Sequence, residues 1–107
     1  MNGLRVGKVQ NNREEEMKNN YFPSNSVLEK AIVDALNELG GTATVPTINE
    51  RIIELLQLPE EIVLMEDEND MSTKLEYRLR WCRTNLKSKG IIRNVKRGTW
   101  ELVPEKE

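Results

Sequence analysis

Basic side chains that could bind a polyanion are concentrated in one segment of the chain, residues 74–97. This segment holds nine Lys and Arg residues and a single acidic residue, Glu76, for a net charge of +8. The rest of the chain holds 7 basic and 17 acidic residues, for a net charge of −10. A dense positive field on ordered elements attracts polyanions, and DNA or RNA is the most common one. The segment therefore predicts nucleic-acid binding.

Other chemistry has little support in the sequence. The chain has no histidine, which removes the commonest general base and metal ligand. A calcium loop starting at Asp67 would need a glycine and a glutamate where Ser72 and Arg78 stand. No glycine-rich phosphate loop and no Cys-x-x-Cys pair occurs. We therefore expect no catalytic residue, no cofactor and no metal, and a protein that is not an enzyme.

The size and composition of the chain predict one domain in the cytoplasm. The 107 residues suit a single domain, and the lone Cys82 fits a reducing compartment. No apolar run approaches the ~18 residues that span a bilayer, and the N-terminus has no apolar signal core. We divide the chain into a flexible N-terminal segment (1–22), one domain (23–104) and a C-terminal tail (105–107). A short edge strand around residues 4–9 is an alternative for part of the first segment.

The elements that must position the basic residues follow from periodicity, caps and turns. An apolar stripe with Gly40-Gly41 behind it predicts a helix over residues 27–39. Thr73 and Glu76 have the spacing of a capping box and predict the start of a helix that runs to residue 89. The other expected elements are a short strand at 42–45, a helix at 46–58, a helical turn at 60–65, and hairpin strands at 91–95 and 99–103. This order predicts an α+β fold that is mainly helical, a winged helix-turn-helix in which the short strand pairs with the hairpin.

The helix after Thr73 presents an apolar seam on one face and a mixed polar face opposite. Leu79, Cys82 and Leu86 fall within ~40° of Leu75 at 100° per residue, which predicts a buried seam. Arg78, Arg83, Asn85 and Lys89 lie nearer that seam, where their stems can pack against the core. In helix-turn-helix proteins the N-terminal part of the second helix enters the major groove. The DNA-binding residues that we predict on this face and at the hairpin tip are Thr73, Lys74, Tyr77, Arg80, Trp81, Thr84, Lys96 and Arg97.

Less specific interpretations of the same residues stay open. A basic face is often only a solvated face, and Tyr77 and Trp81 could be packing residues instead of contacts with DNA. Trp100 on the second hairpin strand is expected to anchor the core, and Cys82 to be an inert small hydrophobe within the seam.

Two sequence patterns give the chain a family resemblance. The pattern Arg78-x-x-Trp81-x-Arg83-x-x-Leu86-x-x-x-Gly90 is followed by Arg97-Gly98-x-Trp100. With the preceding stretches 35–41 and 52–56, it resembles the N-terminal winged-helix domain of Mrr-type restriction proteins, over about three quarters of the chain. The resemblance implies the DNA-recognition part of enzymes that cut modified foreign DNA. Their nuclease has an Asp…Glu-x-Lys site that is not found in this sequence, so we expect the recognition module without the nuclease. Cys82 stands where we expect a small residue, usually alanine.

Three functions are therefore compared. The first is a DNA-binding winged helix of a restriction or host-defence system, with double-stranded DNA as its partner and a nuclease domain or subunit as a further candidate. The second is a winged helix that docks another protein through Tyr77 and Trp81. The third is a stand-alone transcription regulator, for which a dimer is conceivable, although the sequence has no heptad seam to indicate one.

Overall fold

The computed structural model describes residues 22–67 and 72–104, which form four helices and a three-stranded antiparallel sheet. The helices are α3 (Asn25–Glu38), α4 (Val45–Leu56), α5 (Glu60–Val63) and α6 (Lys74–Ser88), and the strands are β2 (Thr42–Thr44), β3 (Ile92–Lys96) and β4 (Thr99–Leu102). This is the predicted α+β, winged-helix-like fold, with every expected element present. Three predictions lie outside the described residues. They are the N-terminal segment apart from Phe22, the alternative edge strand within that segment, and the C-terminal tail.

Helix α3 begins two residues before the predicted start because Ser24 caps it. The Ser24 hydroxyl accepts a hydrogen bond from the Val27 amide at 3.3 Å, which satisfies one of the unpaired donors of the first turn. The helix ends where Gly40 takes a positive φ of 91°, a conformation that side chains with a Cβ rarely adopt. The Gly41 amide then bonds back to the Leu36 carbonyl at 2.7 Å and closes the end of the helix.

The core is built where α3, α4 and α6 meet over the sheet. The predicted seam of α6 is buried throughout, as are most members of the apolar stripes of α3 and α4. Leu55 of α4 is 36% exposed, because it borders a hollow of about 220 Å³ between α3 and the end of α4. Trp100 packs against the core as expected, and the buried cluster consists of Leu28, Ala31, Ile32, Ala35, Leu36, Ile48, Ile52, Leu75, Leu79, Cys82, Leu86 and Ile92.

The predicted pairing of the short strand with the hairpin is confirmed. The sheet order is β2-β4-β3, with Ala43 opposite Trp100 and Asn94 opposite Trp100 on the other side. The register of β3 against β4 shifts between Asn94 and Lys96, which is a β-bulge next to the turn. Gly98 in this turn has a φ of 75°, a conformation that glycine adopts more readily than residues with a Cβ.

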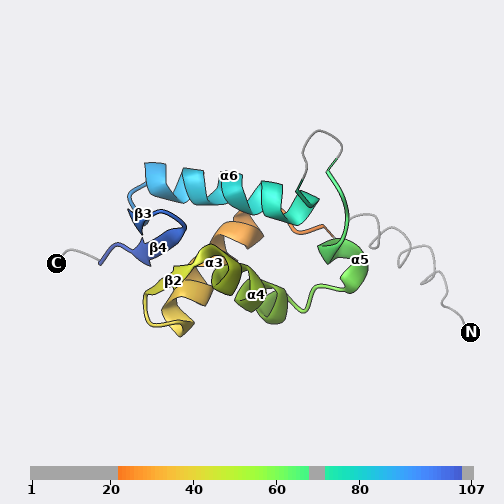
Figure 1. The fold of residues 1–107 in the computed structure, drawn as a ribbon, viewed down its shortest axis with the longest axis horizontal. Helices are drawn as coiled ribbons and strands as arrows, with labels where there is room; N and C mark the ends of the chain where they lie inside the picture. Colours follow the sequence, from red (N-terminus) through yellow and green to blue (C-terminus); the bar gives the residue numbers. More distant parts are fainter. Residues whose placement is uncertain (1–21, 68–71, 105–107) are drawn as a thin grey trace, which may run out of the picture.

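One backbone hydrogen bond ties the hairpin turn to the start of α4. The Val45 amide donates to the Gly98 carbonyl at 3.0 Å. Figure 1 shows the three strands gathered at the C-terminal end of α6, with α5 near the N-terminal end of that helix and α3 and α4 alongside. The fold therefore fixes the hairpin turn, the start of α4 and the middle of α6 relative to one another. No helix in the described part of the chain is long and apolar enough to cross a bilayer.

Candidate nucleic-acid interface

Helix α6 starts at a complete capping box, which fixes the position of its outward face. The Thr73 hydroxyl accepts from the Glu76 amide at 3.2 Å, and the Thr73 amide donates to Glu76 Oε1 at 3.3 Å. Both partners of the predicted box are present, so the reciprocal pairing that the spacing indicated is confirmed. Thr73 is thereby held at the N-cap, with its hydroxyl engaged by the backbone.

Cations and aromatic rings alternate along the exposed face of α6. The Tyr77 and Trp81 rings meet edge to face with their centroids 6.4 Å apart, and the Arg80 guanidinium lies 6.0 Å from the Tyr77 centroid. Trp81 is 52% exposed and lies outside the buried core, so part of its ring is open to solvent. The Thr84 hydroxyl donates to the Arg80 carbonyl at 3.1 Å, one helical turn back. Such a face offers charge, hydroxyl groups and stacking surfaces together.

One flank of α6 is joined to α3. Arg78 Nη1 lies 3.4 Å from Asn25 Oδ1, and both Asn85 and Lys89 reach the carboxylate of Glu29 at 3.3 Å. The Lys74 ammonium and the Arg78 guanidinium lie 4.9 Å and 5.1 Å from the centroid of the Phe22 ring. Cations on this flank therefore hold α6 against α3 and the residues before it.

The opposite flank of α6 carries Arg83, which is only 8% exposed. Its Nη1 atom is enclosed and has no hydrogen-bond partner among the described residues. Burial, and next the positive charge of Arg80, lower the pKa of Arg83. A buried cation without a partner is costly, so this residue marks an incomplete site.

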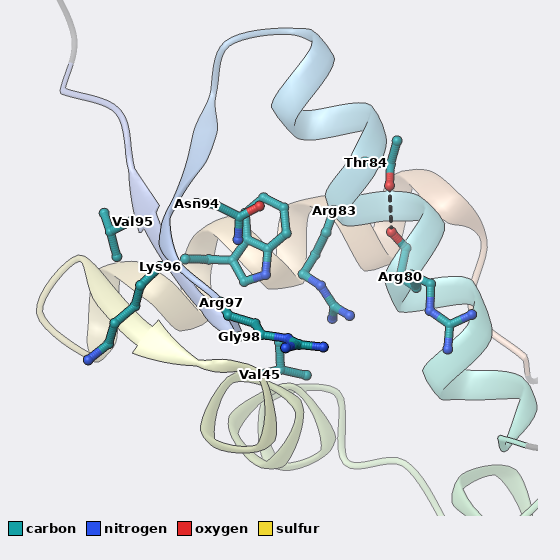
Figure 2. Close-up of a pocket in the computed structure, with 10 residues that line it drawn as sticks. Val45, Arg80, Arg83, Thr84, Asn94, Val95, Lys96, Arg97 and Gly98 are labelled. Carbon is teal, nitrogen blue, oxygen red and sulfur yellow. Dashed lines mark hydrogen bonds between the residues drawn. The ribbon is translucent and has the colours of Figure 1, made fainter.

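A hollow of about 520 Å³ lies between α6, the turn of the hairpin and the start of α4. Figure 2 shows the guanidinium groups of Arg83 and Arg97 turned toward the same space above Val45, whereas the Lys96 ammonium points away from it. Among the described residues that line this hollow, none is acidic. They are Val45, Arg80, Arg83, Thr84, Asn94, Val95, Lys96, Arg97, Gly98 and Trp100.

The structure brings four of the eight predicted residues together around this hollow: Arg80, Thr84, Lys96 and Arg97. Lys74, Tyr77 and Trp81 continue the exposed part of α6 and do not line it, and Thr73 is the helix cap. Two other cations of the basic segment are ion-paired: Lys89 with Glu29 and Arg93 with Glu101 at 3.2 Å. The other basic residues of the segment lie on α6, on β3 and in the hairpin turn.

Sequence reasoning missed the role of Arg83 and of the residues that meet it. Arg83 was expected only to pack its stem against the core, with Arg78, Asn85 and Lys89. On a helix at 100° per residue it falls ~80° to one side of Leu75, whereas those three fall to the other side. That difference was available in the sequence. The contributions of Val45 and Asn94 were not, because they depend on how the sheet joins the helices.

Cys82 is a structural residue. Its side chain is fully buried, and burial, followed by the negative charge of Glu29, raises the pKa of the thiol to about 11. The thiol Sγ lies 3.8 Å from the Asn25 carbonyl oxygen, within reach of a weak hydrogen bond. Among the described residues, no group of three or more Cys, Asp or Glu side chains is placed to hold a metal ion.

Comparison with known proteins identifies the domain. The family model of the Mrr N-terminal domain matches residues 27–105, which is most of the chain. A search of curated proteins and a search of solved structures each give no match.

Proposed function

Because the chain belongs to the Mrr N-terminal domain family, we propose that it is a DNA-binding winged-helix module of a restriction-type system. The observation that carries the proposal is the hollow between α6 and the hairpin turn, which is lined by four basic residues, with the Arg83 and Arg97 guanidinium groups turned into it (Figure 2), and, among the described residues, by no acid. A surface of this kind fits the phosphate backbone, which dominates the affinity of proteins for DNA. We propose no catalytic role for this chain.

In the proposed mode of binding, α6 enters the major groove and the hairpin turn meets the backbone. The capping box holds the N-terminal end of α6, the part of such a helix that contacts base edges in helix-turn-helix proteins. Arg80 would contact phosphate or a guanine edge, and the half-exposed Trp81 ring would touch a thymine methyl group. Lys96 and Arg97 would meet the phosphates beside that groove.

A salt titration tests the proposal. Five or six phosphates met by the cations of α6 and the turn would give a slope of log K against log salt near −5, at ~0.9 per phosphate. The measurement is fluorescence anisotropy of a labelled duplex of about 20 base pairs, starting at roughly 50 mM salt. Binding that weakens with this slope supports the proposal. A folded protein that leaves the anisotropy unchanged at the lowest salt rules it out.

The exposed Trp81 also favours a second candidate, a module that docks another protein. Trp and Tyr are common anchors of protein interfaces, and Trp81 is 52% exposed beside Tyr77. Replacing Trp81 by Ala separates the two functions when it is combined with the salt titration. A docking module would show no salt-dependent binding to duplex DNA in either form, whereas a DNA-binding module would retain a steep salt slope after the substitution.

A further inference from the structure

Arg83 is the feature that the proposed mode of DNA binding leaves unexplained. Its side chain is 8% exposed, and its Nη1 atom is enclosed without a hydrogen-bond partner in the described part of the chain. An arginine keeps its charge, and its five N–H groups are directed to planar and tetrahedral oxyanions. A buried guanidinium with an unpaired nitrogen therefore indicates a group that the protein itself does not supply.

The surroundings of Arg83 are positive on one side and mixed on the other. It lines both the 520 Å³ hollow beside the hairpin turn and a second hollow of about 450 Å³ between α4 and α6. The second hollow includes Glu50 and Glu76, whereas the described residues around the first include no acid. An anion would therefore enter the first hollow, where the Arg97 guanidinium is turned toward the same space (Figure 2).

The N-terminus of α4 adds to the positive potential at this place. Val45 is the first residue of this 12-residue helix and lines both hollows. The first turn of α4 has no acidic residue, and the Thr44 hydroxyl bonds to the Thr47 hydroxyl at 3.0 Å instead of capping the helix. The Val45 amide is engaged by the Gly98 carbonyl and Pro46 has no N–H, so this helix end favours an anion through its dipole and not through a free amide at its first two positions. The helix end and the enclosed Arg83 are independent observations that point to the same ligand chemistry.

We propose that the hollow between α6, the hairpin turn and the start of α4 holds one phosphate group, bound by Arg83 and Arg97. The source that fits the neighbouring basic face is a backbone phosphate of the bound duplex, and in this form the inference rests on the proposed function. A free phosphate monoester presents the same chemistry and would occupy the same place. Two guanidinium groups can share the oxygens of one phosphate, each by paired hydrogen bonds.

A competing explanation is that the Arg83 guanidinium is a hydrogen-bond donor to the side chain of Asn49 and needs no ligand. The Oδ1 atom of Asn49 is also enclosed and unpaired among the described residues, and both side chains line the 450 Å³ hollow. A side-chain rotation that joined them would satisfy a donor and an acceptor without any ligand. This explanation predicts that changing Asn49 and changing Arg83 have the same consequences.

The experiment uses the full chain with Arg83→Met, Arg83→Lys, Asn49→Ala and the control Lys30→Ala. Methionine keeps an apolar stem of similar reach, and lysine keeps the charge if the methionine variant does not fold. Lys30 lies on α3 and pairs with Asp34, so its removal changes the net charge equally at a distant place. Each protein is titrated with inorganic phosphate in amide-resolved NMR spectra, and with a labelled duplex by anisotropy.

The expected result is that phosphate shifts the amide signals of Val45, Thr47 and Gly98 and the Arg83 Nε signal. Arg83→Met should weaken binding of phosphate and of the duplex at least tenfold, Arg83→Lys less so, and the Asn49 and Lys30 variants by no more than about twofold. If the wild type binds the duplex and Arg83→Met binds it equally, the phosphate site is wrong and the proposed function stands. If phosphate shifts these signals but the duplex does not bind, the site takes a free phosphate and the proposed function fails. Equal effects of Arg83→Met and Asn49→Ala would also overturn the site.

Discussion

Replacing Arg80 and Lys96 together by alanine should flatten the salt dependence of duplex binding by a calculable amount. The two residues come from different elements, α6 and the strand that leads into the hairpin turn, yet both line the same hollow. Neither supports the core, because Arg80 and Lys96 are both exposed. The double variant therefore tests whether the two elements act on one ligand, with little change in stability.

The magnitude follows from the arrangement of the nine basic residues of the segment. Lys89 and Arg93 are ion-paired, and Arg78 is directed to Asn25 on the α3 flank. We assign the other six basic residues of the segment to DNA, where they meet about five phosphates if Arg83 and Arg97 share one. At ~0.9 per phosphate, the wild-type slope of log K against log salt is about −4.5. Losing two phosphate contacts makes the slope shallower, at about −2.7, which at ~0.1 M salt corresponds to an affinity loss of roughly 60-fold.

The assay is anisotropy of a labelled duplex over a series of salt concentrations, with the variant Lys30→Ala/Arg51→Ala as the control. Lys30 pairs with Asp34, and Arg51 with Glu38 and Glu54, so the control also removes two positive charges, away from the hollow. The control should keep a slope close to that of the wild type. If both double variants weaken binding equally, the effect comes from net charge alone, and the reasoning from the position of Arg80 and Lys96 is refuted.

Three further predictions concern the framework that holds this face. Thr73→Ala breaks the capping box and should lower the free energy of unfolding by about 1 kcal/mol, which lowers the melting temperature by about 4–8 °C. The control Thr73→Ser should retain most of the stability. Equal melting temperatures for the wild type and Thr73→Ala would contradict the prediction. Leu79→Ala empties a fully buried position in the seam of α6 and should cost about 2–5 kcal/mol in chemical denaturation, and a loss below about 1 kcal/mol would show that the seam is not the core. Burial raises the pKa of the Cys82 thiol from 9.0 to about 11, so the thiol stays protonated at pH 8. The folded protein should therefore react with iodoacetamide at least ~100-fold more slowly than the urea-unfolded chain. Similar rates in both states would mean that the thiol is not buried.

Much of the fold could be predicted from the sequence because local signals and global packing agree. The Thr73 and Glu76 spacing located the start of α6 to the residue, and Gly40-Gly41 located the end of α3. The pairing of β2 with the hairpin also followed from the order of elements, since a three-residue strand needs a partner to be stable, whereas the choice of β4 as that partner was not predicted. The start of α3 was missed by two residues because three neighbouring polar residues, 24–26, could each serve as the cap.

The candidate site could be predicted only in part, because it joins segments that are distant in sequence. Helical periodicity identified the exposed cations of α6, and the glycine turn identified the hairpin tip. Neither signal revealed the hydrogen bond between Val45 and Gly98, which places the start of α4 against that tip. Nor did either signal show that Arg83 would be enclosed, because burial of an arginine depends on what the neighbouring elements cover. Whether Trp81 packs or faces solvent stayed open in the sequence for the same reason, because it depends on what the neighbouring elements cover.

The most direct test of the central claim is to map where a duplex touches the protein. Amide NMR spectra of the full chain, recorded at low salt as a short duplex is added, report on each backbone position separately. The account predicts that the largest shifts fall on the first half of α6, on the turn between β3 and β4 around Gly98, and at Val45. Shifts confined to α3 and α5, whose residues do not line the hollow between α6 and the hairpin turn, or no shifts at all, would contradict it.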